Sequence, residues 1–190
     1  LKHYPSKSSI RLNDFEIDTI QNSHSVPQSV SLLIKTKKNI ILHTGDWKFK
    51  GAKNLKEKPF VNELKALKDL KISTIVSDST NSLIDGYTAS ENDAYNGLKK
   101  IISKSKGLII ITCFSSNISR IKSILEIAKI NEKKVCILGR AIKRSIEAAI
   151  DVGLIKKNYT FYGINEIKKF PKKNLLVICS VSQGEPNSSL

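Results

Sequence analysis

The second half of the chain alternates short apolar runs with longer amphipathic segments, and this alternation strongly constrains the fold. Apolar runs typical of buried strands occupy 72–76, 108–112, 135–138 and 175–179. Between two of them, Ile118, Ile121 and Leu125 recur at helical spacing. Strands separated by helices form parallel sheets, because each return to the sheet needs a crossover. The pattern therefore predicts an α/β domain with a parallel, doubly wound sheet.

The first half of the chain follows a different pattern. Its β-prone runs lie at 10–20, 30–34 and 40–43. The last two runs flank Lys37-Lys38-Asn39, a polar break typical of a hairpin turn. A lysine-rich loop follows, and apolar residues at every third position then predict a helix over 61–70. This region is expected to form mainly antiparallel β-structure.

The two patterns indicate parts of two domains. Thr88-Ala89-Ser90-Glu91 matches a capping box, in which a side-chain oxygen starts a helix and a glutamate follows three residues later. That box predicts a helix to about Ser105. We therefore assign residues 1–87 to one domain and residues 88–190 to another. The chain has no methionine, even at position 1, and is expected to be a region of a longer protein.

Composition excludes several classes of protein. No apolar run approaches the ~20 residues that span a bilayer, so no membrane segment is expected. The first residues match neither a signal peptide nor a transit peptide. Cys113, Cys136 and Cys179 lie far apart in apolar runs, which indicates buried, reduced thiols. We expect a cytoplasmic protein.

The formal net charge of +15 favours a polyanionic partner, but it has two explanations. A basic surface attracts a phosphate backbone, and nucleic-acid binding would follow from it. However, only four of the 32 basic residues are arginine, and the lysines accompany abundant isoleucine and asparagine. A general composition bias explains such a charge equally well, so charge alone does not separate the two.

Two turns near the start carry residues that can bind metal. Asn22-Ser23-His24-Ser25-Val26-Pro27 follows one predicted strand, and His43-Thr44-Gly45-Asp46-Trp47-Lys48 follows another. Imidazole and carboxylate are ordinary zinc ligands, so His24 and Asp46 are candidates. Taken singly, each has a commoner explanation, as a packed histidine and a turn aspartate. Two ligands also leave a site open, so the remaining ligands would have to come from elsewhere.

Polar side chains also follow three of the predicted parallel strands. In such sheets ligands bind beyond the carboxyl ends of the strands. Asp78 could instead satisfy turn amides, and Ser115 and Ser116 could cap a helix. The glycine-containing loop 182–185 can present several backbone N–H groups to an anion. The candidates at these strand ends are Asp78, Ser115, Ser116, Asn117, Ser182, Gln183, Gly184 and Glu185.

The order of these motifs raises their significance. Asn22–Pro27, His43–Lys48 and Ser77-Asp78-Ser79-Thr80-Asn81 together resemble the metallo-β-lactamase fold nucleases that carry a β-CASP insertion. The later segments narrow the resemblance. Cys113–Arg120, Gly139-Arg140 and Ser182-Gln183-Gly184-Glu185-Pro186 are similar to the ribonuclease J family. The resemblance covers nearly the whole chain, from about Ser23 to Leu190.

The resemblance implies a fold and roles for individual residues. It implies part of a metallo-β-lactamase αββα-type domain, followed by a β-CASP domain. His24 matches a metal-ligand histidine, and Asp46 matches the aspartate that bridges two zinc ions. The other ligands of that site are expected before residue 1 and after residue 190. Asp78 matches an acidic residue near the metals, with an orienting or proton-handling role. RNA and phosphate contacts are expected at Ser115, Ser116, Asn117, Arg120, Arg140 and 182–185.

The implied function is hydrolysis of RNA phosphodiester bonds. The family resemblance implies an endonuclease and 5′-to-3′ exonuclease in RNA processing and decay, in which two metal ions activate water. Its substrate would be RNA with a 5′ monophosphate, and the intact protein would be a homo-oligomer, either a dimer or a tetramer. The 190-residue chain itself is expected to be inactive. Two alternatives remain open. One is a related nuclease that acts on DNA or at RNA 3′ ends, and the other is a non-catalytic RNA-binding paralogue.

Overall fold

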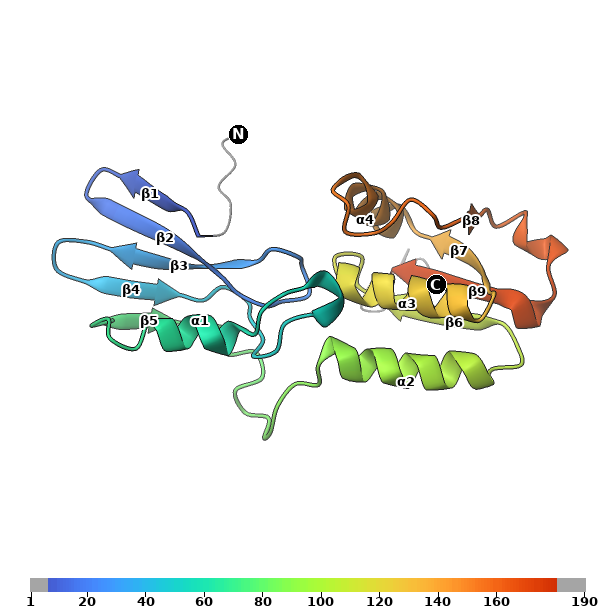
Figure 1. The fold of residues 1–190 in the computed structure, drawn as a ribbon, viewed down its shortest axis with the longest axis horizontal. Coiled ribbons are helices and arrows are strands. Elements are labelled where there is room, and N and C mark those ends of the chain that lie inside the picture. Colours follow the sequence, from blue (N-terminus) through green and yellow to red (C-terminus); the bar gives the residue numbers. More distant parts are fainter. Residues whose placement is uncertain (1–6, 181–190) are drawn as a thin grey trace. The chain divides into compact units, whose positions relative to one another are not determined.

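The computed structural model describes residues 7–180, which divide into two compact units at Ser90 and Glu91 (Figure 1). Each unit has its own sheet and its own core. Within the described residues, the helices are all too short or too polar to cross a membrane. The loop residues Ser182, Gln183, Gly184 and Glu185 lie outside this range.

The first unit is built on a five-stranded sheet in the order β1-β2-β3-β4-β5. Its first four strands are antiparallel neighbours, and β5 pairs with β4 in parallel. The turn between β3 and β4 closes at Thr36, whose N–H donates to the Asn39 carbonyl at 2.9 Å, as the polar break predicts. The strands are β1 (Ser9–Leu12), β2 (Phe15–Gln21), β3 (Val30–Lys35), β4 (Ile40–His43) and β5 (Thr74–Val76).

Helix α1 (Phe60–Ala66) covers one face of this sheet, after a short 3-10 turn at Lys53–Leu55. The Phe60 ring is fully buried against Ile20, Leu33 and Leu42. The helix is shorter than predicted, because the chain tightens after Ala66 into turns closed by bonds between residues three apart. Leu67 nevertheless packs against the same core, which explains why the helical spacing extended past the helix.

The prediction of a buried strand over 72–76 was wrong in one respect. A strand forms there, but Ile75 and Val76 are 62% and 47% exposed. Strand β5 lies at the edge of the sheet, and within the described residues its pairing is with β4. An apolar run alone does not distinguish a central strand from an edge strand.

The second unit contains the predicted parallel sheet, in the order β6-β9-β7-β8. Strand β9 is central and its apolar residues are all buried, as their uninterrupted run indicates. The two-residue strand β8 carries no pattern long enough to predict. The strands are β6 (Ile109–Cys113), β7 (Lys134–Leu138), β8 (Phe161–Tyr162) and β9 (Leu175–Ser180).

Three helices, α2 (Glu91–Lys104), α3 (Ile118–Ile130) and α4 (Arg140–Asp151), accompany this sheet. Helix α3 contacts both of the others and β7, so Ile121, Ile124 and Leu125 are fully buried. The other face of the sheet is covered by the segment between β8 and β9, where Ile167 packs against Cys136 and Cys179. That segment forms the 3-10 turns Ile167–Lys169 and Lys172–Asn174. Within the described residues, therefore, the second face is not covered by an α-helix, and the predicted doubly wound arrangement with helices on both faces is not seen there, because the connection from β8 to β9 forms only 3-10 turns.

The start of α2 differs from the prediction. The helix begins at Glu91, so this glutamate is the first helical residue and not the third. Its carboxylate accepts two hydrogen bonds from the Arg120 guanidinium, at 2.8 and 3.2 Å. The Glu91 carboxylate thus binds Arg120 on α3, whereas in a capping box it would accept a hydrogen bond from the Thr88 N–H.

All three cysteines are free and buried, as the sequence predicts. Burial raises the pKa of the Cys113 thiol to about 11, and it also raises the pKa values of Cys136 and Cys179. We expect a maleimide probe at about pH 8 to label the native thiols slowly and the denatured thiols fully, because the thiolate is the reactive form. Rapid labelling of a cysteine in the native protein would contradict this expectation.

Candidate functional site

Three turns of the first unit meet at one edge of its sheet. Strands β2 and β4 run in the same direction because both are antiparallel to β3, and β5 is parallel to β4. Their carboxyl ends, Gln21, His43 and Val76, therefore lie at the same edge. The residues at and after these ends belong to the three sequence motifs Asn22–Pro27, His43–Lys48 and Ser77–Asn81.

Asn22 ties the first turn to the second. Its side chain is almost fully buried, and its Nδ2 donates to the carbonyls of Thr44 at 2.9 Å and Asp46 at 3.3 Å. The same nitrogen lies 3.2 Å from the Ser31 hydroxyl oxygen, and Ser31 itself donates to the Thr44 carbonyl. One amide thus holds the backbone on both sides of Gly45. Sequence reasoning named Asn22 as part of a motif but assigned it no role.

Further hydrogen bonds join the third turn to the second. The Thr44 N–H donates to the Val76 carbonyl at 2.9 Å, and the Thr44 hydroxyl accepts from the Asp78 N–H at 3.2 Å. The Trp47 indole donates to the Ser77 hydroxyl at 3.3 Å. The first and second turns are also joined where the Lys48 N–H donates to the Ser23 carbonyl, at 2.6 Å. The three motifs are therefore one hydrogen-bonded assembly, although 30 residues separate Trp47 from Ser77.

The two candidate ligands lie on this assembly. His24 is half-buried, with Nδ1 3.3 Å from the Ser25 hydroxyl, and the side chain of Asp46 is exposed. Gly45 has φ +59°, and the nearest atom to an added Cβ would be 3.6 Å away. The backbone conformation, and not lack of space, therefore favours glycine beside Asp46.

The donor chemistry of His24 and Asp46 fits zinc, but the described residues do not complete a site. Residues 7–180 contain no group of three or more histidine, cysteine, aspartate or glutamate side chains arranged to hold a metal. A structural zinc site has four ligands and a catalytic one usually three. A zinc site at His24 and Asp46 would thus require further ligands from outside the described residues.

Asp78 is held as a carboxylate within its own turn. Its Oδ1 accepts from the Thr80 hydroxyl at 2.5 Å and from the Thr80 N–H at 2.9 Å. These bonds, with smaller contributions from the Trp47 N–H and the charge of His24, lower the pKa of Asp78. A lowered pKa makes Asp78 a poorer proton acceptor at neutral pH and a more persistent negative charge.

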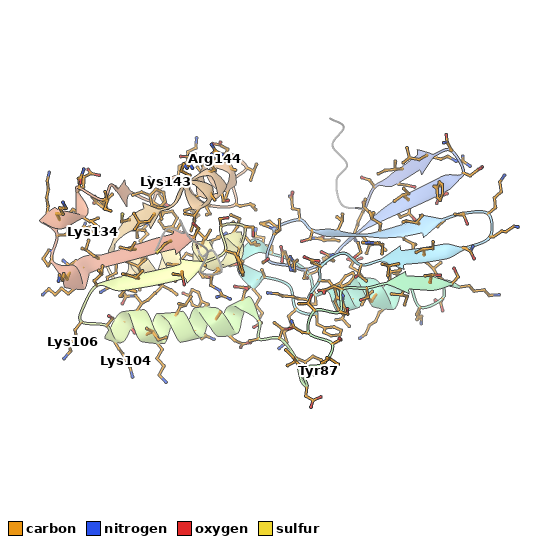
Figure 2. All side chains as sticks on the ribbon, turned by 180° about the vertical axis from the view of Figure 1, so that it is seen from behind. Tyr87, Lys104, Lys106, Lys134, Lys143 and Arg144 are labelled. Atoms are coloured by element: carbon orange, nitrogen blue, oxygen red, sulfur yellow. The ribbon has the colours of Figure 1, made fainter. Side chains whose placement is uncertain are left out.

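A hollow of about 510 Å³ opens beside these turns. Its walls are Trp47–Lys50 and the loop from Asp78 to Thr88. The rings of Trp47 and Phe49 meet edge to face at 4.8 Å, and Phe49 meets Tyr87 at 5.8 Å. Tyr87 is 83% exposed (Figure 2). This aromatic wall was not predicted, since Tyr87 has no local signal and lies 38 residues from Phe49.

In the second unit, the candidates after β6 lie at the start of α3. Asn117 caps this helix, with its Oδ1 accepting from the Arg120 N–H at 2.9 Å. Ser115 is half-buried, and Ser116 is exposed. Cys113 pairs with Ser180, so the last described residue of β9 lies beside the exit of β6.

Arg120 and Arg140 differ in their availability for RNA. Arg140 is the first residue of α4 and is exposed. The Arg120 guanidinium is held by the Glu91 carboxylate, whose side chain is 11% exposed. The RNA contact proposed for Arg120 remains a prediction, and this ion pair provides it with a structural role as well.

We expect Glu91→Ala to lower the free energy of unfolding by about 1–2 kcal/mol, since it leaves a partly buried guanidinium without its carboxylate. Urea unfolding followed by circular dichroism measures this change. Glu147→Ala, at an exposed position of α4, is the control and should have a smaller effect. Equal stability of the Glu91 variant and the wild type would show that the pair is not stabilising.

Comparisons with known proteins identify the family. Residues 106–190 match the family model described as "Ribonuclease J, beta-CASP domain". The chain is 34% identical to ribonuclease J of Sinorhizobium meliloti, over 95% of this chain and 32% of the relative. It is 30% identical to ribonuclease J2 of Bacillus subtilis, over 100% of this chain and 34% of the relative. The chain thus spans about a third of the length of these curated relatives.

A solved structure shows the same fold. A protein of unknown function from Enterococcus faecalis V583 superposes with a TM-score of 0.67, over 97% of this chain and 45% of that one. At 12% sequence identity, this likeness concerns the fold alone. The family model and the ribonuclease J relatives carry the assignment, and they agree with the parallel sheet of the second unit. The chain therefore belongs to the ribonuclease J family and contains its β-CASP domain region.

Proposed function

We propose that this chain is part of a metal-dependent ribonuclease that hydrolyses RNA phosphodiester bonds. The observation that carries the proposal is the assembly of three turns, in which Asn22 and Thr44 join the His24, Asp46 and Asp78 segments at one sheet edge. In this proposal the first unit is part of a metallo-β-lactamase domain. The relatives named ribonuclease J support RNA as the substrate.

His24 and Asp46 would contribute to a site for two zinc ions. An imidazole nitrogen and a carboxylate are suitable donors, and the other ligands would come from residues outside the described range. Bound zinc ions supply Lewis acidity that activates water and stabilises a leaving phosphodiester oxygen. The chain's own contribution is to fix the backbone on both sides of Asp46 through Asn22.

Asp78 would act as a positioning residue and not as a general base. Its carboxylate accepts from the Trp47 N–H and from Thr80, and its lowered pKa keeps it ionised near neutral pH. In this proposal the ionised carboxylate of Asp78 orients the polar side chains near it, His24 among them. It also orders the start of the loop that forms one wall of the hollow.

The hollow next to these turns suits a nucleotide. Bases stack on aromatic side chains with little sequence preference, and exposed Tyr87 and Phe49 offer such faces. Lys50 is exposed on the same wall and can attract a phosphate. In the second unit, Ser115, Ser116, Asn117, Arg140 and the loop 182–185 would hold a 5′ monophosphate without reading a base.

The wider activity follows from the same proposal. The intact protein would cleave both internally and from the 5′ end, in RNA processing and decay in the cytoplasm, as a dimer or tetramer. Because residues 7–180 lack a cluster of three ligands, the 190-residue chain alone should bind zinc weakly and should not cleave RNA. Isothermal titration with zinc tests this, and a tight stoichiometric site would contradict it.

The deciding experiment compares substrates for the intact protein. We expect cleavage of 5′-monophosphorylated single-stranded RNA, no cleavage of DNA of the same sequence, and loss of activity on chelation with recovery on adding zinc. Preferential cleavage of DNA, or trimming from RNA 3′ ends, would identify a different nuclease of the superfamily. Binding of RNA without any metal-dependent cleavage would identify a non-catalytic paralogue.

A further inference from the structure

The segments that enter the four parallel strands of the second unit are rich in lysine. Because these strands are parallel, their entry segments lie together at the amino edge of the sheet, opposite the carboxyl edge, where Cys113 and Ser180 lie side by side. Glu132 and Glu166 are the acidic residues of these segments. We call this surface the amino edge; its ten lysines are Lys104, Lys106, Lys133, Lys134, Lys156, Lys157, Lys168, Lys169, Lys172 and Lys173.

Contacts between different entry segments show that the amino edge is continuous. Lys133 Nζ donates to the Lys173 carbonyl at 2.6 Å, which joins the segments before β7 and β9. Lys134 Nζ lies 5.8 Å from the ring centroids of Tyr162 and Phe170, beside β8. Lys104, Lys106 and Lys134 lie at the same end of the unit (Figure 2). The lysines therefore form one basic surface and not separate clusters before each strand.

The charge of the amino edge is available to a ligand. Eight of its lysines are exposed, and Lys133 and Lys134 are half-buried. Among the ion pairs of residues 7–180, none involves an amino-edge lysine. In the first unit, by contrast, Lys35 is paired with Glu16 and Asp18, and Lys37 with Asp14.

A uniform composition bias does not explain this distribution. Residues 91–180 contain 18 lysine and arginine residues against 7 aspartate and glutamate residues, whereas residues 7–90 contain 13 against 9. Lysine is common in both units, but acidic residues accompany it in the first and are nearly absent at the amino edge. The net positive charge is thus concentrated on one unit and on one edge of its sheet.

We propose that the amino edge binds the phosphate backbone of single-stranded RNA, at a surface separate from the carboxyl edge. The five- and six-residue strands β6 and β9 separate the two edges by roughly 15–20 Å. Lysine heads on flexible stems neutralise phosphates without reading bases, so the binding is independent of sequence and sensitive to salt. The choice of RNA as the polyanion rests on the proposed function, but the inference concerns binding, which is measured separately from cleavage.

The test uses the intact protein with Lys156, Lys157, Lys172 and Lys173 changed to alanine. All four side chains are exposed, and the Lys173 carbonyl that accepts from Lys133 is retained. Binding of a 5′-hydroxyl RNA of about 20 nucleotides is measured by fluorescence anisotropy with a chelator present, over a series of salt concentrations. At about 100 mM salt, we expect at least a tenfold rise in Kd, and a decrease of about 2–3 in the slope of log K against log salt.

The matched control removes the same charge from the first unit. The exposed residues of the control are Lys38, Lys65, Lys68 and Lys71. Their change to alanine should raise Kd less than threefold, because it lowers the net charge of the protein without removing a lysine of the amino edge. Circular dichroism verifies that both variants are folded. Equal losses of affinity in the two variants would overturn the proposal. Wild-type RNA affinity in the amino-edge variant would overturn it too. Binding to phosphatidylserine vesicles is measured in parallel, and a variant that loses only vesicle binding would likewise contradict the proposal.

Discussion

Substitution of either candidate ligand, His24→Ala or Asp46→Ala, is expected to reduce RNA cleavage by the intact protein by roughly 10³-fold or more. In the proposed site, loss of either ligand would weaken zinc binding, and loss of Asp46 would also remove negative charge that partly neutralises the bound cations. The side chain of Asp46 is exposed and that of His24 half-buried, so neither change should unfold the first unit. Single-turnover cleavage of a 5′-monophosphorylated RNA, together with zinc content by mass spectrometry, measures both effects.

Asp14→Ala is the matched control for Asp46→Ala. Asp14 is an exposed aspartate in the turn between β1 and β2, and its contact with Lys37 is a long, solvent-exposed ion pair. Its removal should leave cleavage and zinc content unchanged, because exposed ion pairs contribute little. If both His24→Ala and Asp46→Ala retain wild-type cleavage, the assignment of these residues as ligands is wrong.

Asn22→Ala is expected to lower the free energy of unfolding by about 2–3 kcal/mol and to reduce cleavage at temperatures where the variant is fully folded. The substitution removes the Asn22 donor from the buried Thr44 carbonyl, which keeps its bond from Ser31, and from the partly buried Asp46 carbonyl. It also releases the turn that presents Asp46. Urea unfolding and single-turnover cleavage, measured on the same preparation, test the two effects separately.

Ser31→Ala separates stability from placement of Asp46. Ser31 is fully buried and donates to the Thr44 carbonyl, but it makes no hydrogen bond to Asp46. Ser31→Ala should lower the free energy of unfolding by about 1–2 kcal/mol and should reduce cleavage less than Asn22→Ala does. Equal losses of cleavage in the two variants would show that Asn22 acts through general stability, and not through the turn at Asp46.

The elements with a strong local period were predictable. The alternation in the second half led to a parallel sheet, because apolar strands of this length must be buried on both faces and must be joined by crossovers. Buried, free cysteines followed from their apolar surroundings. Edge strand β5 and strand β8 were not correctly described, since neither edge position nor a two-residue pairing leaves a period in the sequence.

The candidate site was predictable as a set of residue types and not as an arrangement. The motifs named His24, Asp46 and Asp78, but nothing local indicated that Asn22 and Thr44 would join their turns. Glu91 was assigned to its own helix cap, whereas its carboxylate binds Arg120 on α3. Partners this far apart in sequence are selected by the packing of whole elements, which no short window of residues contains.

Residue chemistry and local periodicity thus indicate most of the elements and the motifs, and the order of the motifs carries the resemblance to the family. The elements and motifs follow from the sequence because a strand or a helix start depends on residues that are neighbours in the chain. The common edge of β2, β4 and β5, the buried amide of Asn22 between two turns, and the gathering of ten lysines at the amino edge depend on strand direction and order. Those are properties of the folded sheets, since they arise from hydrogen bonds between residues distant in the chain.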